Sequence, residues 1–355
     1  MDSEATAKPT LLVTGANGVV GSRLCQEALA KGYRVVAAIR PKGEDGTVIP
    51  TRELRMLKMK YREALHIVPL ELPDAAQCRS IFDVHPEITH VVHAAGLSGG
   101  YDMSAAQKID AVNREGTIVL AHAANTHAKN TQQHVPFHFI SSAEALRYAD
   151  NPDQVVEMPG RCYRTYAKSK FEASEWLKQY GNGLSQLDIS ISYPSALLAR
   201  KPKVNLAGNM LGKANKMENL VEAYSAGQLY SDTNRARELT FTGLGNYIRD
   251  VLAAIETPPS KGVKEYGIEI DHRLTLGELA DTIAEVADEF YAHPDYETAR
   301  SKPDMSLQET PKPKPTARFQ YPDLPRPPNA PPHEKTSIYD VLVAQCANIS
   351  GRVLV

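Results

Sequence analysis

The sequence predicts a doubly wound α/β fold, in which helices cover both faces of a parallel β-sheet. Through the first 200 residues, short apolar runs rich in β-branched residues alternate with longer amphipathic stretches. The short runs are largely apolar at successive positions, which is typical of strands buried on both faces. Alternation of this kind requires parallel strands joined by right-handed helical crossovers.

Six strands are expected in this part of the chain, at residues 10–15, 33–39, 65–70, 89–95, 136–142 and 187–193. The amphipathic helices expected between them lie at 19–31, 74–84, 104–128 and 166–180.

After residue 200 the alternation ends, and a smaller, mostly helical part is expected. Helices are predicted at 206–227, 247–256 and 274–292, with a late strand at 263–270. Thr275 and Glu278 stand three residues apart at the start of the last helix, as in a capping box. Residues 303–332 hold ten of the 24 prolines and are expected to form an extended surface segment. Whether this segment docks a proline-reading partner is left open.

Composition and charge narrow the class of protein. The chain has 355 residues, 42% of them hydrophobic, and can bury a large core. Its net charge of −2, without long runs of one sign, argues against nucleic acid as a partner. The first residues are polar and acidic, and no apolar run is long enough to span a membrane. Four widely spaced cysteines favour free thiols over disulfides or a metal site. A cytoplasmic protein that acts on a small molecule, with neither a nucleic-acid nor a membrane partner, is expected.

A glycine triplet marks the first strand–helix junction. Gly15, Gly18 and Gly21 are spaced three apart, directly after the first strand and at the start of the first helix. In that context the triplet is typical of a dinucleotide-binding turn, in which the glycines allow a tight turn and close approach of a pyrophosphate. The helix N-terminus supplies amides for the phosphates. A flexible loop without a ligand is the alternative.

Five segments, in this order, resemble motifs of the extended branch of the short-chain dehydrogenase/reductase superfamily, which includes NAD-dependent epimerases and dehydratases. They are TGANGVVG (14–21), VVHAAG (91–96), DAVNREGT (110–117), ISSA (140–143) and YAKSK (166–170). The resemblance covers residues 9–200 and continues weakly through RELTF (237–241).

The resemblance implies a Rossmann-type fold. Residues 1–200 are then the NADP-binding domain, and 239–272 return to it. The substrate-binding region consists of 201–238 and 273–355, which includes the proline-rich segment. Because the family often associates through the helices that bear Asn113 and Tyr166, a homodimer is compatible with the sequence.

The end of the second predicted strand bears on the choice of cofactor. NAD-preferring relatives usually carry a carboxylate there for a ribose hydroxyl, but this chain has Ile39 followed by Arg40. The ending is similar to that of NADP-preferring dihydroflavonol and cinnamoyl-CoA reductases. Arg40 can pair with a 2′-phosphate, and Lys42 adds a second positive charge. NADP(H) is therefore expected ahead of NAD(H), although Arg40 as a merely solvated cation stays open and Asn17 replaces a basic residue of some NADP-using relatives.

By the resemblance, the residues expected to contact the cofactor are Gly15, Asn17, Gly18, Val19, Val20, Gly21, Arg40, Lys42, Glu71, Leu72, Ala94, Ala95, Gly96, Asn113, Tyr166, Lys170, Pro194 and Ser195.

Tyr166, Lys170 and Ser142 are the expected catalytic residues. Tyr166 and Lys170 lie four apart on a predicted helix and project from one face. A neighbouring ammonium favours the phenolate and moves the pKa of the tyrosine toward the working range. The family serine, here Ser142, binds the substrate oxygen beside the tyrosine. A surface contact between Tyr166 and Lys170 is the alternative.

The residues expected near the substrate are Leu97, Ser98, Glu144 and Arg237, together with segments 96–103 and 204–230. Glu144 is offset like a catalytic glutamate of nucleotide-sugar dehydratases, but the residues around it differ, so a capping or solvated role is the alternative. His93 is interpreted as a hydrogen-bonded core histidine, because no metal-ligand spacing surrounds it.

The leading expectation is an NADPH-dependent reductase or dehydrogenase of a ketone, aldehyde or secondary alcohol on a small molecule. The alternative is a nucleotide-sugar epimerase, dehydratase or decarboxylase that retains its cofactor, which Arg237 favours. A third alternative, a cofactor-sensing regulator, is disfavoured because the chain keeps both Tyr166 and Lys170.

Overall fold

The computed structural model describes residues 9–42, 46–98, 103–155, 163–198, 238–260, 262–267, 269–275, 278, 279, 281, 282, 285, 322–334 and 337–341. The chain divides into two units. The first contains Met1–Ser195, Gly245–Glu269 and Tyr321–Pro332, and the second contains Ala196–Leu244, Ile270–Gln320 and His333–Val355.

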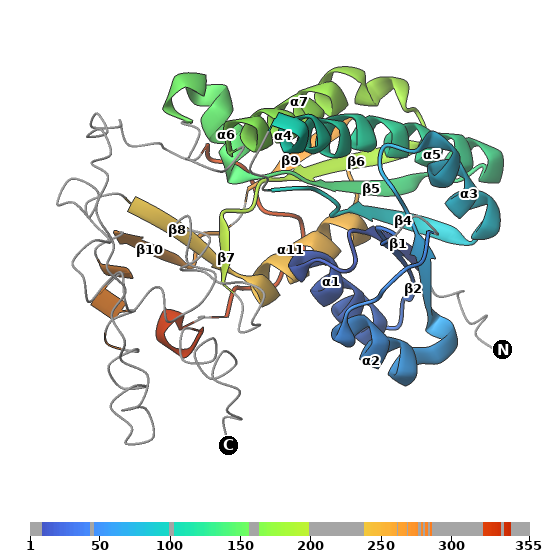
Figure 1. Ribbon diagram of the computed structural model, residues 1–355, viewed down its shortest axis with the longest axis horizontal. Coiled ribbons are helices and arrows are strands. Elements are labelled where there is room, and N and C mark those ends of the chain that lie inside the picture. Colours follow the sequence, from blue (N-terminus) through green and yellow to red (C-terminus); the bar gives the residue numbers. More distant parts are fainter. Residues whose placement is uncertain are drawn as a thin grey trace. The chain divides into compact units, whose positions relative to one another are not determined.

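The first unit is built on a seven-stranded sheet in the order β3-β2-β1-β4-β5-β6-β9 (Figure 1). The strands are β1 (Thr10–Thr14), β2 (Arg34–Ile39), β3 (Leu65–Pro69), β4 (Ile88–His93), β5 (Val135–Ile140), β6 (Leu187–Ser192) and β9 (Val263–Tyr266). Every neighbouring pair is parallel. The doubly wound α/β prediction is confirmed, and each of the six strands expected before residue 200 lies within two residues of its predicted bounds.

Helices cover both faces of this sheet. They are α1 (Val19–Ala30), α2 (Arg52–Tyr61), α3 (Ala75–Val84), α4 (Met103–Asp110), α5 (Gly116–Thr131), α6 (Ala143–Asp150), α7 (Tyr163–Tyr180) and α11 (Leu244–Glu256). Figure 1 shows α3, α5 and α7 on one face and α1, α2 and α11 on the other. Single 3₁₀ turns form at Arg62–Ala64, Pro152–Gln154 and Gly181–Gly183.

Three helical features differ from the prediction. The pattern at 104–128 predicts one helix, whereas a π turn at Ala111–Glu115 separates α4 from α5. Helices α2 and α6 were not expected from the sequence. Helix α2 buries Leu54, and α6 buries Ala143 and Ala145.

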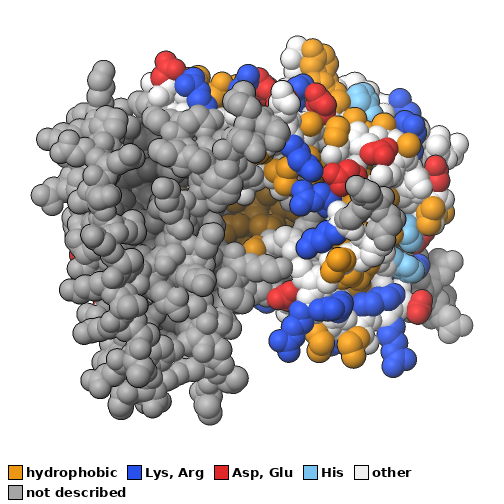
Figure 2. Space-filling view, viewed as in Figure 1, with side chains coloured by type: hydrophobic (Ala, Val, Ile, Leu, Met, Phe, Trp, Pro, Cys, Tyr) orange, Lys and Arg blue, Asp and Glu red, His pale blue; other side chains and the backbone are white. Residues whose placement is uncertain are grey.

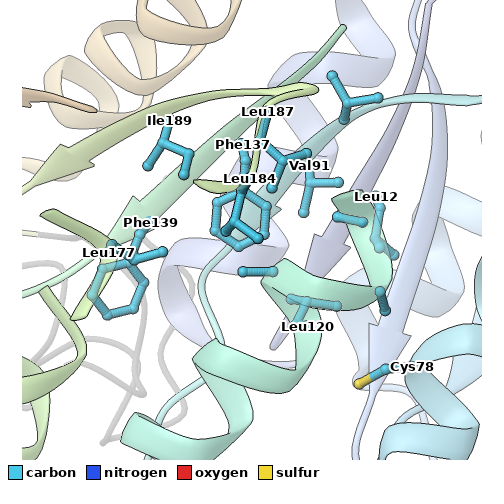
Figure 3. Close-up of a cluster of buried hydrophobic side chains, with 14 of the residues drawn as sticks. Leu12, Cys78, Val91, Leu120, Phe137, Phe139, Leu177, Leu184, Leu187 and Ile189 are labelled. Carbon is cyan, nitrogen blue, oxygen red and sulfur yellow. The ribbon is translucent and has the colours of Figure 1, made fainter. Parts of the chain in front are cut away.

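The main core lies between the sheet and helices α3, α5 and α7. Figure 3 shows Phe137 and Phe139 of β5 packed with Leu120 of α5 and Leu177 of α7. Both phenylalanines are fully buried, and each burial of this kind stabilises the fold by roughly 1.5–3 kcal/mol. This packing fixes β5, whose end carries Ser142, against α7, which carries Tyr166 and Lys170.

The described part of the second unit holds a three-stranded sheet in the order β10-β8-β7. Its strands are β7 (Ala196–Leu198), β8 (Glu238–Gly243) and β10 (His272–Thr275). The capping box is confirmed, since Glu278 N donates to Thr275 Oγ1 at 3.1 Å and Thr275 N donates to Glu278 Oε2 at 2.6 Å. The predicted helix 206–227 and most of 274–292 lie outside the described residues.

The last part of the proline-rich segment is bound to the first unit. Residues 322–332 contain no helix or strand, as expected, and Gly267 N donates to the Pro325 carbonyl at 3.0 Å. Arg326 forms an ion pair with the buried Asp250 of α11 at 2.6 Å. The resemblance assigns this stretch to the substrate-binding region, a division of the chain that stays a prediction; its contacts here are with the first unit. Residues 303–321 lie outside the described residues.

In the part of the chain that the structure describes, no helix combines the length and the apolar character needed to cross a bilayer.

Candidate active site

The turn between β1 and α1 has no room for side chains at its two ends. Gly15 has a φ of +67°, and a Cβ there would lie 2.7 Å from Ala95 Cα. A Cβ at Gly21 would lie 2.3 Å from the Gly15 carbonyl oxygen, so only glycine lets α1 begin this close to the turn. Gly18 is the N-cap of α1 and provides no side-chain cap for the first amides of the helix, which include those of Val19 and Val20. This cradle of bare backbone and helix amides fits a dinucleotide pyrophosphate.

Asn17 lies in the same turn, but its side chain binds the loop before α2. Its Nδ2 donates to the Ile49 carbonyl at 3.0 Å, and its Oδ1 accepts from Thr51 N at 2.9 Å. Thr51 in turn caps α2, because its hydroxyl accepts from Leu54 N. The Asn17 side chain therefore connects the glycine turn to the loop before α2, and its second N–H and the backbone amide remain for a cofactor.

The end of β2 presents the two cations expected to select the cofactor. Ile39 is buried, whereas Arg40 and Lys42 are exposed just after it. Lys42 N donates to the Thr47 carbonyl at 2.8 Å, which ties the backbone at Lys42 to the segment before α2.

The loop after β3 meets the same edge of the sheet. Glu71 is partly buried, and its amide donates to Gln77 Oε1 at 2.8 Å. Leu72 is buried against Gly116, where a Cβ would lie 2.9 Å from the Leu72 Cβ. Leu72 is therefore a packing residue as well as a predicted contact of the cofactor.

Asn113, in the π turn, connects the loop after β4 to α7. Its Oδ1 accepts from Leu97 N at 2.8 Å, and its Nδ2 donates to the Leu97 carbonyl at 2.9 Å. The same Nδ2 also donates to Ser169 Oγ at 2.9 Å. Ala94 and Ala95 are partly buried in this loop, and Gly96 and Ser98 are exposed.

Lys170 lies beneath that loop with its ammonium buried. Its Nζ donates to the Ile140 carbonyl at 2.8 Å and lies 4.7 Å from the centre of the Phe139 ring. A Cβ at Gly96 would lie 3.1 Å from this Nζ, so glycine keeps the space above the ammonium open. Burial lowers the pKa of Lys170 to about 7, because little water is left to solvate the charge.

Tyr166, one turn earlier on α7, meets Ser142 at the end of β5. Burial raises the pKa of the phenol above its ordinary value, a hydrogen bond with the Ser142 side chain lowers it, and the charge of Glu144 raises it. The net direction is upward. The predicted trio of Ser142, Tyr166 and Lys170 is thus brought together at the ends of β5 and α7, with Glu144 close enough to act on the tyrosine.

Ser142 has a second task as the N-cap of α6, since its Oγ accepts from Glu144 N at 3.2 Å. Glu144 is mostly buried, and its carboxylate lies 3.6 Å from the guanidinium of Arg147 one turn on. The carboxylate therefore lies near Arg147 and close enough to Tyr166 for its charge to act on the phenol.

The loop after β6 borders this trio. The Pro194 carbonyl accepts from Ala143 N at 2.9 Å, so the loop is tied to the start of α6. Pro194 and Ser195 are both partly buried. Arg237 and segments 99–102 and 204–230, all expected near the substrate, lie outside the described residues.

His93 is confirmed as a hydrogen-bonded core residue. Its Nδ1 lies 2.7 Å from Thr14 Oγ1 and its Nε2 lies 3.0 Å from Thr117 Oγ1. Thr117 donates its one hydroxyl proton to the Asn113 carbonyl, so Nε2 carries the imidazole proton. Burial, with the charge of Lys170, lowers the pKa of His93 to about 3. Through Thr117, the neutral ring stabilises the π turn that contains Asn113. No sequence motif predicted this role.

Ser169 is a further residue that the sequence did not single out. It accepts from Asn113 and donates to the Tyr166 carbonyl at 2.9 Å, so it connects the π turn to the helix turn that bears the tyrosine. Its place inside YAKSK is the only sequence signal. Among the described residues, no group of three His, Cys, Asp or Glu side chains could hold a metal ion.

Curated relatives match part of the chain. UDP-glucose 4-epimerases from Drosophila melanogaster and Mus musculus are 29% and 28% identical over 178 and 179 residues. These segments cover 48% and 47% of this chain and 48% of each relative, so the match spans about half the length of these proteins.

Solved structures share the fold over nearly the whole chain. The UDP-glucose 4-epimerase of Bifidobacterium longum, in complex with NAD⁺ and UDP, has a TM-score of 0.63 at 17% identity and covers 96% of this chain and 98% of its own. That of Thermotoga maritima, with UDP-glucose, has a TM-score of 0.61 at 15% identity and covers 96% and 99%. The model of the NAD dependent epimerase/dehydratase family matches residues 11–258, which is more than half of the chain. The chain therefore belongs to the NAD-dependent epimerase/dehydratase family.

Proposed function

We propose that this protein binds a nicotinamide dinucleotide at the β1–α1 turn and interconverts a carbinol and a carbonyl group of a small molecule. The observation that carries the proposal is the cluster of Ser142, Tyr166 and Lys170. In it the Ser142 side chain hydrogen-bonds Tyr166, and the Lys170 ammonium is held by the Ile140 carbonyl one helical turn away.

Each residue of the cluster has a distinct task. Tyr166 holds or takes up the proton of the reacting oxygen at its Oη. Ser142 orients that oxygen, since its hydroxyl already faces the phenol. When Lys170 is protonated, its charge lies one turn from the tyrosine and favours the phenolate, against the burial that raises the pKa of Tyr166. A bound nicotinamide supplies hydride transfer at the carbon.

A nucleotide sugar is the substrate class we favour, and epimerisation the reaction. The curated relatives are UDP-glucose 4-epimerases, and this supports the alternative from the sequence over the NADPH reductase that the motifs alone placed first. A carboxylate beside the tyrosine, Glu144, suits polar sugar hydroxyls better than an apolar ketone. In this reaction class the cofactor is regenerated in each turnover, so it stays bound.

A reductase is the second candidate, and one observation favours it. Arg40 and Lys42 are exposed where the adenine ribose of a dinucleotide is expected, and no carboxylate ends β2. A guanidinium there can pair with the 2′-phosphate of NADP. A cytoplasmic location and a homodimer stay predictions.

The two candidates differ in what happens to the cofactor. The purified protein is denatured, and the extract is assayed for NAD and NADP; retained NAD supports the epimerase and its absence supports the reductase. UDP-glucose or UDP-galactose is then supplied, and conversion between them is followed by chromatography without added cofactor.

Tyr166→Phe tests the shared chemistry, with Tyr180→Phe on the same helix as the control. Proton transfer by a positioned side chain contributes roughly 10²–10⁴-fold, so kcat is expected to fall by at least about 100-fold in the first variant and to stay unchanged in the second. If Tyr166→Phe keeps the turnover of the unaltered protein, the assignment of the cluster is wrong.

A further inference from the structure

Helix α2 and the loop before it carry a surface that mixes exposed apolar and cationic side chains. Among the described residues, five large hydrophobic side chains are exposed by half or more, and three of them, Ile49, Met56 and Met59, lie on this segment. Met59 is the most exposed of the five, at 71%. Figure 2 shows Lys and Arg side chains gathered over α2 with hydrophobic side chains among them.

The cations flank the two methionines on the outer face of the helix. Residues 52, 55, 56 and 59 follow the spacing that places side chains on one helical face. Arg52, Arg55, Lys60 and Arg62 are all exposed. Four cations and a single acid, Glu53, lie within Arg52–Tyr61, although the whole chain has a net charge of −2.

The inner face of α2 is already used by the fold, so the outer face is the part left for a partner. Leu54 is fully buried, and Lys58 Nζ donates to the carbonyls of Arg62 and Leu65 at 2.9 and 2.8 Å. None of the residues on the outer face belongs to the catalytic cluster or to the predicted cofactor contacts. The outer face is therefore separate from the proposed catalytic site.

We propose that α2 docks this protein peripherally on an anionic lipid bilayer. Met56 and Met59 enter the headgroup layer, and Arg52, Arg55, Lys60 and Arg62 pair with lipid phosphates and carboxylates. A convex helix with projecting thioethers suits a soft planar surface. A nucleic-acid backbone complements the cations but offers no apolar layer to the methionines. The proposal departs from the sequence-based expectation of no membrane partner, which rested on the lack of a spanning run.

The test is co-sedimentation of the full chain with vesicles. Vesicles of phosphatidylcholine alone are compared with vesicles that contain about 30% phosphatidylserine, at ionic strengths of about 0.1 and 0.5 M. Binding to the anionic vesicles only, weakened at the higher salt, is expected. The cofactor and substrate are not needed, so failure of the proposed catalytic function would not affect the result.

Two comparisons test whether binding depends on α2 itself and not on the total charge or apolar surface of the protein. Each compares substitutions on α2 with matched substitutions elsewhere. Arg55→Gln with Lys60→Gln is expected to weaken binding by about 25-fold, at roughly fivefold for each cation removed. Arg79→Gln with Lys129→Gln removes the same charge from exposed positions of α3 and α5 and should leave binding unchanged. Met56→Ser with Met59→Ser should weaken binding, whereas Val84→Ser, at a side chain 67% exposed, should not.

Several outcomes would overturn the proposal. They are equal binding to both kinds of vesicle, no binding to either, or equal losses in the α2 variants and their controls. Binding to RNA or to an acidic polypeptide without binding to anionic vesicles would assign the surface to another partner and would also reject the bilayer. Circular dichroism checks that each variant is folded, as expected for surface substitutions.

Discussion

Strands β5 and β6 are buried on both faces, but the two faces hold different chemistry. Toward α5 and α7, Phe137, Phe139, Ile189 and Ile191 join an apolar cluster. Toward α11, the intervening residues form a hydrogen-bonded chain. In this chain His138 contacts Ser190 at 2.7 Å and Ser192 at 2.8 Å, and Ser192 contacts Tyr247 of α11 at 2.8 Å.

The comparison shows that alternation of polar and apolar residues does not measure exposure. On β6 the alternating pattern LDISIS is typical of a strand with one face exposed to solvent. Here Ser190, Ser192 and His138 are no more than 3% exposed, because α11 covers them. Burial of these groups is tolerated because each has a partner within the protein. The apolar face is expected to depend on volume, and the polar face on complete hydrogen bonding.

Truncation on the apolar face should have the largest effect. Phe137→Ala leaves a cavity against α5 and α7, and the free energy of unfolding should fall by about 3–5 kcal/mol. Urea denaturation measures this change, and Phe137→Leu, which keeps most of the volume, serves as the milder control. A loss below about 1 kcal/mol would show that the cluster collapses around the gap and does not depend on shape.

The six strands and the glycine turn were predictable because their signals are local. Gly15 and Gly21 are required by contacts within one strand–turn–helix unit, and the apolar runs are continuous along the chain. Thr275 and Glu278 likewise satisfy each other three residues apart.

Contacts between distant segments left no such signal. Tyr247 meets Ser192 across 55 residues, and Arg326 meets Asp250 across 76. In the site, the YAKSK motif predicted Lys170 but not its hydrogen-bond partner. That partner is the backbone carbonyl of Ile140, which any residue at this position would supply. The role of His93 could not be predicted either, because its partners come from distant segments. Its hydrogen bonds to Thr14 and Thr117 follow from the packing of β1, β4 and α5.

Acid should act on both faces, because each holds a buried histidine whose pKa is lowered. Burial lowers the pKa of His93 and of His138 to about 3, from 6.5. At these two positions the unfolded chain therefore takes up protons below about pH 6.5, whereas the folded chain does not until about pH 3. The free energy of unfolding should fall as the pH drops through this window, by about 1.4 kcal/mol per pH unit for each histidine.

Urea denaturation at several pH values between about 6 and 4 measures that slope. His138→Gln and His93→Gln should each reduce it by about 1.4 kcal/mol per pH unit, whatever their stability at neutral pH. An unchanged slope in one variant would show that the corresponding face admits water or a counter-charge to the protonated ring.

Loss of one hydroxyl on the polar face should have the smallest effect. Tyr247→Phe keeps the buried ring but removes the hydroxyl that ends the series of hydrogen bonds. Ser192 is then left with His138 as its remaining side-chain partner. A cost of about 1–2 kcal/mol is expected from the incompletely bonded serine. Tyr180→Phe, at a half-exposed tyrosine of α7, should change stability by less than about 0.5 kcal/mol. If the loss of stability in Tyr247→Phe is as small as in this control, the hydrogen bond with His138 is enough for Ser192. The polar face then tolerates substitution as readily as the surface does.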